Sequence, residues 1–396
     1  MNGARRAVVV GGGIGGLAAA LALQRCGWHV QVLERRTMSA VAAQPGSGIS
    51  IWPNGMRALA ALGVHEQVLA GATLAGRSGV RTASGRWIAR TDIGDAVRDR
   101  FGLPLVITTR QRLVAGLIGA LGADRIEYGF PVDALDAEAP VARCGGQARD
   151  ADLVIIADGA RSRLRSVVLG AGGPRLRYAG YTSWRFIAPR PAGPAEPAET
   201  WGPGGQRFAV LPLDAEHVYC YATATSEPGR HAADEREELR ARFSAWHSPI
   251  PDLLKVLPPG AVIRTDITYL SKPPDVWHLH RAALLGDAAH AMTPDLGQGG
   301  CQALEDAATL GALLPARLSD DDVRHALAEY TGHRARRAAA IARRSVRAGR
   351  LYQSPMWLRC LAARASGAVP ARMVVRALDP VLAWAPPPGP GRAGEA

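Results

Sequence analysis

The segment from residue 6 to residue 34 constrains the fold of this chain more than any other. A β-branched run over residues 6–10 precedes the sequence GGGIGG at residues 11–16, an alanine- and leucine-rich stretch follows, and a second apolar run ends at Glu34. A strand, a glycine turn, a helix and a second strand within about thirty residues predict the βαβ unit of a nucleotide-binding parallel sheet.

The glycines of this turn have separate physical roles. Gly11 permits the tight turn, Gly13 lets the backbone approach a pyrophosphate, and Gly16 allows the helix to pack closely on the strand. The free N–H groups at the N-terminus of the helix that follows the turn are expected to face the phosphates. Glu34 can accept hydrogen bonds from ribose hydroxyls, and its charge disfavours a 2′-phosphate. The segment therefore predicts a tightly bound FAD or NAD rather than NADP.

Composition narrows the class of protein. A chain of 396 residues predicts two to three structural units. Its five cysteines are scattered and never spaced as C-x-x-C, which argues against disulfides and against a metal site, and favours a reducing, cytoplasmic location. The sequence contains no apolar run of about eighteen residues, so we expect no membrane span.

The net charge of +12 comes almost entirely from arginine. The densest stretch, residues 334–350, is expected to be the solvated face of a helix, with an anionic ligand or a membrane surface as alternatives. A nucleic-acid partner is not expected, because no nucleic-acid-binding motif accompanies the charge.

Two later segments also lead from a strand into a loop. Residues 154–165 are typical of a buried strand that delivers Asp158 into a loop. Residues 284–306 are typical of a strand that ends at Asp287 and is followed by a turn at Pro294 and by a glycine loop that opens a helix. Asp287 can bond a polyol hydroxyl, and the N–H groups of the glycine loop can face a developing negative charge. Either segment alone is also compatible with an ordinary strand–turn–helix connection.

In this order, the glycine motif, the Asp-Gly motif at Asp158 and the Gly-Asp motif at Asp287 resemble those of the single-component flavoprotein monooxygenases of the para-hydroxybenzoate hydroxylase type. The resemblance covers about residues 6–350. It implies an α/β fold class: a Rossmann-like FAD-binding domain, an inserted mixed β-sheet (α+β) substrate domain, and C-terminal helices. TPDLGQGGCQALEDA from Thr293 and YAGYTSW from Tyr178 look most like the branch that contains FAD-dependent urate hydroxylase and zeaxanthin epoxidase.

The resemblance also implies a division of the chain. We expect FAD-binding parts over residues 1–74, 96–172 and 271–325, substrate-domain parts over 75–95 and 173–270, a C-terminal helical region over 326–385, and a disordered tail over 386–396. The nucleotide domain is thus expected to be discontinuous, with a second domain inserted into it.

Cofactor-binding positions follow from the same resemblance. Arg35 and Arg110 would contact the adenosine and phosphate half of FAD, and Asp287 the ribityl or pyrophosphate region. The loop from Gly297 would lie against the N1–C2=O edge of the isoalloxazine, and Asp158 would serve both the FAD and the reduced nicotinamide site. The full set of implied contacts is Gly11, Gly13, Ile14, Gly16, Glu34, Arg35, Gly48, Arg110, Asp158, Asp287, Pro294, Gly297, Gln298, Gly299 and Gly300.

Three residues are candidates for the substrate site. In urate hydroxylase an arginine and a tyrosine on neighbouring pocket strands contact substrate, and the matching positions here are Arg207 and Tyr219. An arginine such as Arg207 or Arg185 would stabilise a phenolate-like form of the substrate. A solvated arginine at a strand end and a core tyrosine are the alternative interpretations. The pair Trp184-Arg185 departs from urate hydroxylase, which puts urate itself in question.

A dry chamber is expected around the reacting atoms, because the oxidising flavin species decays in water. Candidate wall side chains on the inserted sheet are Phe186, Phe208, Val210 and Tyr221. His290 and Cys301 are expected to be packing residues.

The implied activity is that of an FAD-dependent monooxygenase. It would use NAD(P)H and O₂, through a C4a-hydroperoxyflavin, to hydroxylate or epoxidise a small aromatic, heteroaromatic or polyene substrate, as a monomer or homodimer. The alternatives are an FAD-dependent reductase or cyclase without oxygenation, a non-catalytic flavin-binding relative, and an NAD-dependent dehydrogenase, in which the two later motifs have no role. A halogenase is not expected, because W-x-W-x-I-P and a lysine before mid-chain are missing from the sequence.

Overall fold

The computed structural model describes residues 5–191 and 196–388. Its first layer is a mostly parallel six-stranded sheet, whose β-branched central strands are buried on both faces. In spatial order the strands are β18 (His278–Leu279), β19 (Ala282–Leu284), β12 (Leu153–Ile156), β1 (Arg6–Val10), β2 (His29–Glu34) and β8 (Ile126–Tyr128). Because β1 lies between β12 and β2 and parallel to both, the glycine turn that follows it lies at the middle of the carboxyl edge.

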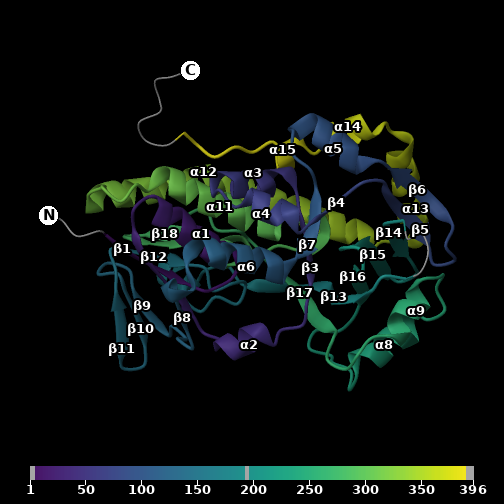
Figure 1. Cartoon of the computed structure of the whole chain (residues 1–396), viewed down its shortest axis with the longest axis horizontal. Coiled ribbons are helices and arrows are strands. Elements are labelled where there is room, and N and C mark those ends of the chain that lie inside the picture. The colour runs from purple at the N-terminus through teal and green to yellow at the C-terminus, as the bar shows by residue number, and fades with distance from the viewer. Residues whose placement is uncertain (1–4, 192–195, 389–396) are drawn as a thin grey trace.

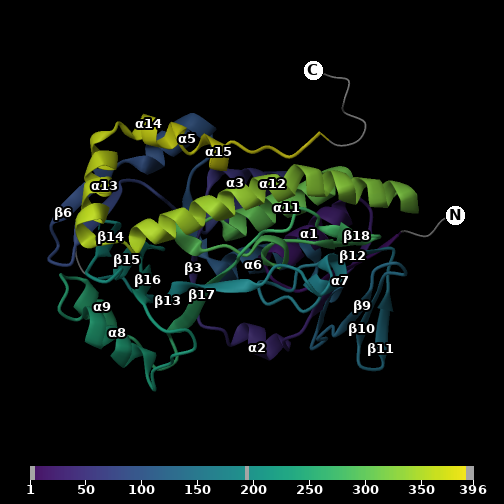
Figure 2. The same ribbon diagram turned by 180° about the vertical axis from the view of Figure 1, so that it is seen from behind.

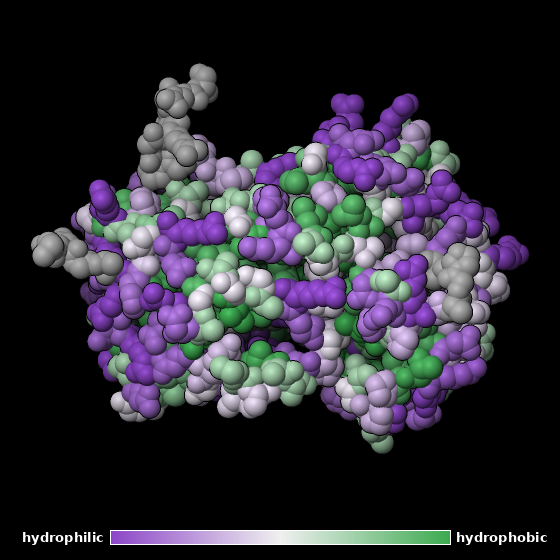
Figure 3. Space-filling model, viewed as in Figure 1, coloured by the Kyte–Doolittle hydropathy of each residue, from purple (hydrophilic) through white to green (hydrophobic). Residues whose placement is uncertain are grey.

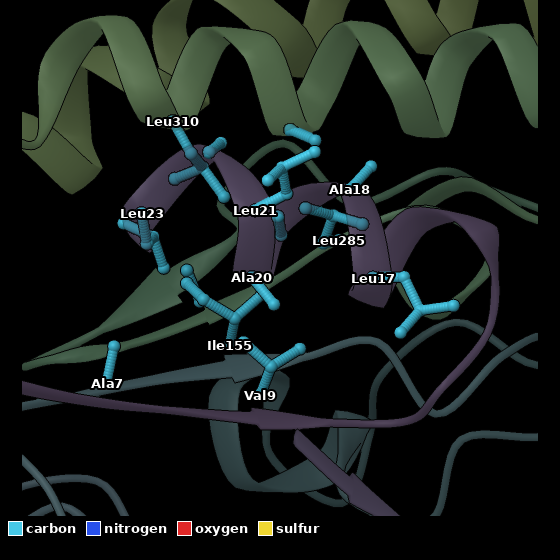
Figure 4. Close-up of a cluster of buried hydrophobic side chains, with 14 of the residues drawn as sticks. Ala7, Val9, Leu17, Ala18, Ala20, Leu21, Leu23, Ile155, Leu285 and Leu310 are labelled. Atoms are coloured by element: carbon cyan, nitrogen blue, oxygen red, sulfur yellow. The ribbon is translucent and has the colours of Figure 1, made fainter. Parts of the chain in front are cut away.

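Helices cover this sheet and form the main core. α1 (Ile14–Arg25) follows the glycine turn, and its buried alanines let it pack closely against α11 (Gly299–Leu313). Leucine side chains of α1 lie between sheet residues such as Ile155 and the helix residue Leu310 (Figure 4). The core thus ties the N-terminal turn to the helix that begins in the later glycine loop.

Two three-stranded sheets flank this core. One, in the order β11-β10-β9, consists of β9 (Ala134–Asp136), β10 (Val141–Cys144) and β11 (Gln147–Asp150). The other, in the order β3-β7-β4, consists of β3 (Gly48–Ile51), β4 (Thr73–Leu74) and β7 (Val106–Thr109).

The second layer is a mixed seven-stranded sheet. Its strands, in spatial order, are β17 (Ile263–Leu270), β13 (Leu176–Pro189), β16 (His217–Thr225), β15 (Arg207–Pro212), β14 (Ala198–Trp201), β5 (Ser78–Thr82) and β6 (Trp87–Thr91). β14 and β5 pair in parallel and the other neighbours are antiparallel. Strands from two separate parts of the chain therefore meet in one sheet, and the expected fold class is confirmed.

The outer face of this sheet packs on α8 (Glu235–Phe243) and α9 (Ile250–Lys255). Phe186, Phe208 and Val210 point to these helices, so the expectation that they line the substrate chamber is wrong. The physical reason is the two-residue period of a strand. These three side chains lie on the face that the helices cover, and alternation by itself does not reveal which face is turned toward the cofactor.

A long helix spans both layers. α12 (Asp320–Tyr352) begins with a capping box at Ser319 and runs past both sheets (Figures 1 and 2). Arg334 is fully buried, so the expectation of a simply solvated face over residues 334–350 is wrong at this position. The reason is that α12 packs on α11, and Arg334 lies on the side of the helix that meets carboxylates of α11.

The remaining helices complete the cover. They are α2 (Met38–Ala42), α3 (Pro53–Ala61), α4 (His65–Ala70), α5 (Ile93–Phe101), α6 (Arg110–Leu121), α7 (Arg165–Leu169), α10 (Asp287–His290), α13 (Met356–Ala368), α14 (Ala371–Arg376), α15 (Asp379–Leu382) and the 3₁₀ turns η1 (Ala123–Arg125) and η2 (Pro294–Leu296). Within the described residues, no helix is both long and apolar enough to cross a membrane. The domain boundaries stay a prediction, and the expected tail lies outside the described residues from residue 389 onward.

Candidate active site

The N-terminal glycine turn is packed on one side and open on the other. Gly11 has a φ of +114°, and a Cβ added there would lie 2.4 Å from the carbonyl oxygen of Ala157. A Cβ on Gly16 would lie 1.9 Å from the carbonyl oxygen of Gly11. A Cβ on Gly13, in contrast, would meet nothing closer than the guanidinium of Arg110, at 3.9 Å. The turn is therefore closed toward the core and leaves space in front of Gly13, where a pyrophosphate would approach.

Glu34 lies at the end of β2 beside this turn. Its carboxylate accepts hydrogen bonds from the backbone N–H of Gly12 at 2.8 Å and from the side chain of Arg36 at 2.8 Å. Burial raises the pKa of Glu34, but the hydrogen bonds and charge of Arg36 outweigh burial, so the pKa lies below its ordinary value and the group is ionised. The adjacent Arg35 is exposed, and its contact with the cofactor stays a prediction.

The Asp-Gly and Gly-Asp motifs meet at the same turn. A Cβ on Gly11 would lie 3.2 Å from the Cα of Asp158. Arg165 donates hydrogen bonds to the backbone carbonyl of Asp287 at 3.1 Å and to that of Ala160 at 2.7 Å, so it joins the two motifs. Burial lowers the pKa of the Arg110 guanidinium, and the charge of Asp287 opposes this shift.

The later glycine loop closes the crevice. Gly297 adopts a φ of +61°, and a Cβ there would lie 3.1 Å from the Nε1 of Trp52. A Cβ on Gly299 would lie 4.0 Å from a carboxylate oxygen of Asp287. A Cβ on Gly300 would lie 3.0 Å from the side chain of Ile49 on β3. The loop is therefore fixed beside Asp287 and β3, and its N-terminal end faces the same space as the first glycine turn.

Several buried polar atoms at this crevice have no hydrogen-bond partner within the described part of the chain. They are Asp158 Oδ1, Arg185 Nε, Trp52 Nε1 and Gln298 Nε2. Unpaired buried donors and acceptors are costly, and each calls for a partner. Together with the open space at Gly13, they fit a large polar cofactor that extends from the first glycine turn to the later glycine loop. On the side that Figure 3 shows, the molecular surface is hollowed near its lower middle, where α2 stands off from the body.

A buried polar network supports the glycine loop from behind. Arg334 forms ion pairs with Glu305 and with Asp306, the latter at 2.7 Å, and all three side chains are fully buried. Asp306 also accepts hydrogen bonds from His290 at 2.7 Å and from the backbone of the Gly-Asp motif. Gln298 in the loop accepts a hydrogen bond from Asn54, which also donates to Glu305.

Burial raises the pKa of Glu305 and of Asp306, but Arg334 and the other donors outweigh it, so both carboxyl groups have a pKa below their ordinary values. His290 is thus a buried member of a charged network, and Cys301 is buried against Gly55. Sequence reasoning did not find this network, because its members come from four helices and only α12 packing on α11 brings them together.

The inner face of the seven-stranded sheet covers the crevice. A Cβ on Gly48 would lie 2.3 Å from the ring of Tyr219, so β3 is pressed against this face. Tyr221 and Ile187 also point inward, in one cluster with Tyr219 and Ile107. Burial raises the pKa of Tyr219 to about 12, so its hydroxyl stays protonated at neutral pH. The predicted residues Gly48 and Tyr219 are in contact range, as a shared site requires.

Arg207 is buried on the same face and is already paired. Its guanidinium donates to Asp295 at 2.8 Å and to Thr223 at 3.1 Å, and lies 3.8 Å from Glu199. Burial lowers the pKa of Arg207, but Glu199 and Asp295 outweigh it and raise the pKa above its ordinary value. The alternative of a solvated arginine is wrong, because the loop that carries Asp295 folds back onto the sheet. Asp295 lies within the TPDLGQGG motif and could have been proposed from sequence as its charge partner.

Arg185 differs from Arg207 in its charge balance. Its side chain donates to the hydroxyl of Thr265 at 2.8 Å, and no ion pair with a carboxylate is found for it among the described residues. On β13 it pairs across the sheet with Tyr221. Arg185 therefore offers an uncompensated positive charge to the crevice, whereas two carboxylates balance the charge of Arg207.

Comparison with known proteins agrees with this geometry. Residues 5–345 match the model of a family described as FAD binding domain. The chain belongs to this family. Its relatives include the aurachin C monooxygenase/isomerase of Stigmatella aurantiaca, 37% identical over 353 residues that cover 87% of this chain and 89% of the relative. The FAD-dependent urate hydroxylase of Mycolicibacterium vanbaalenii is 35% identical, with 86% and 87% covered.

Among solved structures, Klebsiella pneumoniae HpxO complexed with FAD and uric acid has a TM-score of 0.85 and 28% identity, covering 97% of this chain and 98% of that one. The chain is accordingly a flavin-dependent monooxygenase with FAD as its cofactor, and NAD(P)H is the electron donor typical of the family. The family and the fold expected from the three sequence motifs are confirmed.

Proposed function

We propose that this monooxygenase hydroxylates a planar, electron-rich ring that carries a hydroxyl group, with nitrogen heteroaromatics as the favoured class. The ring would lie between the glycine loop at Gly297 and the inner face of the seven-stranded sheet, beside Arg185 and Tyr219. The observation that carries this proposal is the packing of Gly48 against the ring of Tyr219. Gly48 lies on β3 beside the cofactor crevice and Tyr219 on the inner face of the sheet, so the crevice and this face are directly adjacent.

The cofactor-binding roles are proposed for the residues at the crevice. The N–H groups at Gly13 and at the start of α1 would hold the pyrophosphate, Glu34 the ribose, and Asp287 the ribityl or pyrophosphate region. When bound, FAD supplies the activation of O₂, which side chains cannot provide. The chain itself binds and orients the two reactants and keeps water away from them.

Arg185 has a specific role in this proposal. A positive charge beside a ring hydroxyl favours the anionic form of that hydroxyl, lowers its pKa and makes the ring a better nucleophile. Arg185 is the inner-face arginine whose charge is not balanced by an ion pair, so we assign this role to it rather than to Arg207. Arg207 would instead fix the loop of Asp295 against the sheet.

The remaining inner-face groups orient and shield the ring. Tyr219 keeps its proton at neutral pH and can donate a hydrogen bond to a ring oxygen or nitrogen. Tyr221 already donates to Glu199, and Ile187 and Ile107 supply apolar wall. Trp184 points to the outer face, where its indole donates to Glu235 at 2.7 Å, so its departure from urate hydroxylase does not alter the ring site directly.

The relatives support a heteroaromatic ring. The name urate hydroxylase assigns to that relative a planar nitrogen heterocycle, and HpxO was solved with uric acid. We propose the ring class and not urate itself for this chain, because the pair Trp184-Arg185 is expected from the sequence to depart from urate hydroxylase.

The test uses the purified holoenzyme. Hydroxylated purines, pyridines, quinolones and phenols are screened for stimulation of NADH or NADPH oxidation, with H₂O₂ measured in parallel and labelled O₂ used to trace oxygen into the product. Coupled turnover with one labelled oxygen atom in the product supports the proposal. Turnover without O₂ would indicate a reductase or cyclase, and flavin that NAD(P)H never reduces would indicate a non-catalytic flavin-binding relative.

We further propose a cytoplasmic enzyme that acts as a monomer or homodimer. All five cysteines are free, as in a reducing compartment. Light scattering of the holoenzyme measures the oligomeric state, and a tetramer would contradict this part of the proposal.

A further inference from the structure

A cavity of about 120 Å³ adjoins the candidate substrate crevice. Its walls come from the three-stranded β3-β7-β4 sheet and from the seven-stranded sheet, and include Leu105 and Ile107 near β7 and Leu211 at the end of β15. Ile107 and Leu211 also pack with Tyr219 in one hydrophobic cluster. The cavity therefore borders the inner face of the sheet, and none of the proposed cofactor-binding residues lines it.

The inner face changes from charged to apolar toward this cavity. Along β15 the inward side chains are Arg207, Ala209 and Leu211 in turn. In the same row as Leu211 lies Tyr219, and next to it Ile187 on β13. A ligand that matches this face has a polar ring at one end and an apolar group at the other.

Length and volume set the size of the apolar group. A ring beside Ala209 lies two residues from Leu211, about 7 Å along the strand, so a substituent on the ring reaches the cavity. An apolar cavity of about 150 Å³ stays dry when empty and binds benzene. A cavity of about 120 Å³ therefore accommodates about five carbon atoms.

The cavity opens to solvent on the side that Leu74 lines. Leu74, which lines it, is 51% exposed, and Arg77 beside it is exposed as well. A chain longer than the cavity would emerge here rather than clash with a closed wall.

We propose that this cavity binds an alkyl or alkenyl side chain of the substrate, so that the substrate is a hydroxylated ring with an apolar chain of about five or more carbons. This inference rests on the proposed function, because the ring must lie beside Ala209 for its substituent to enter. It adds the chain, which the ring site by itself does not require.

The first test is a substrate series on the wild-type holoenzyme. One active ring scaffold is compared without a chain and with ethyl, butyl, hexyl and decyl chains. Each buried methylene should lower KM by about fourfold until the cavity is full near five or six carbons, after which KM stays constant. kcat should hardly change, because the chain contacts are the same in the ground state and the transition state.

The second test changes the cavity. Leu211→Phe reduces its volume, and the preference in kcat/KM for the hexyl substrate over the chainless one should fall by about tenfold or more. Leu361→Phe is the matched control, because Leu361 is an exposed leucine on α13 that does not line the cavity. It should leave the preference unchanged.

The outcomes separate the two proposals. Equal KM values for the chainless and hexyl substrates, with coupled turnover of both, would refute the chain site and leave the ring hydroxylation standing. If no ring with or without a chain stimulates NAD(P)H oxidation by enzyme whose flavin is reducible, both proposals fail. A KM series that falls and then levels, lost in Leu211→Phe, supports the chain site.

Discussion

Replacing Arg334 by methionine should destabilise the protein strongly. The variant keeps the length of the side chain but leaves the buried carboxylates of Glu305 and Asp306 without their shared cation. Removing one partner of a buried ion pair costs about 3–5 kcal/mol of unfolding free energy, because the remaining charges are buried and uncompensated. Arg337 still reaches Glu305, so Asp306 is the more affected of the two.

The loss converts into a measurable shift of Tm. With an unfolding entropy of about 2.1 cal/mol/K per residue, a chain of 396 residues has about 0.8 kcal/mol/K, so Tm should fall by about 4–6 °C. The assay is thermal unfolding of the holoprotein at a fixed excess of FAD, because bound ligand itself raises Tm. Arg336→Met, an exposed arginine on the same helix, is the control and should change the unfolding free energy by less than about 0.5 kcal/mol.

The pH dependence gives a second check on the same variant. Glu305 and Asp306 have a pKa below their ordinary values in the folded state, so the stability they contribute is present above about pH 4.5 and is lost as pH falls through the folded pKa. In Arg334→Met, protonation removes the unpaired buried charge. The difference in Tm between wild type and variant should therefore narrow as the pH falls, starting above the ordinary carboxyl pKa of about 4.5, because burial without a cation raises the pKa of these groups in the variant. A loss no larger than that of Arg336→Met, or a difference that does not narrow in acid, would refute the reasoning.

Three further predictions concern the site. Gly13→Ala should fold, as far-UV circular dichroism would show, but should purify with little FAD, and retained flavin would contradict this prediction. Gly16→Ala should fail to fold, because its Cβ would lie 1.9 Å from a carbonyl oxygen. Arg185→Met should lower kcat/KM by about 10- to 100-fold and move the rise of the pH–rate profile to higher pH, and the exposed Arg177→Met on the same strand should do neither. Cys301 should not be alkylated at about pH 8 in the native protein, because burial raises its pKa to about 12. Mass spectrometry after brief labelling measures this, and an alkylated Cys301 would contradict the prediction.

Local sequence patterns were sufficient to predict those parts of the site that depend on one short segment each. The turn at Gly11–Gly16, the carboxylate at Glu34 and the loops at Asp158 and Asp287 each follow a strand, and a parallel sheet places the carboxyl ends of its strands at one edge. The convergence of these segments could be expected from the sequence for that reason. The hydrogen bond from Arg36 to Glu34 could not be expected, since the direction of a side chain just past a strand end depends on the local backbone.

Side-chain direction on the inserted sheet shows where pattern alone fails. Arg207 and Tyr219, chosen by resemblance, lie on the inner face of the sheet, whereas Phe186 and Phe208, chosen by hydrophobicity, lie on the outer face. Both faces of this sheet are buried, one by helices and one by the cofactor half of the chain, so hydrophobicity does not distinguish them.

The sequence by itself determined the nucleotide-binding architecture, because glycine turns and strand-end carboxylates act through backbone geometry that is local to a few residues. The resemblance of its three motifs to a known family indicated the cofactor and the class of reaction. Only the tertiary structure decided which arginine keeps a free charge, which face of the inserted sheet meets the cofactor crevice, and where the apolar cavity lies. These properties depend on which side chains from distant segments meet and neutralise one another, as Asp295 does for Arg207 and as Glu305 and Asp306 do for Arg334.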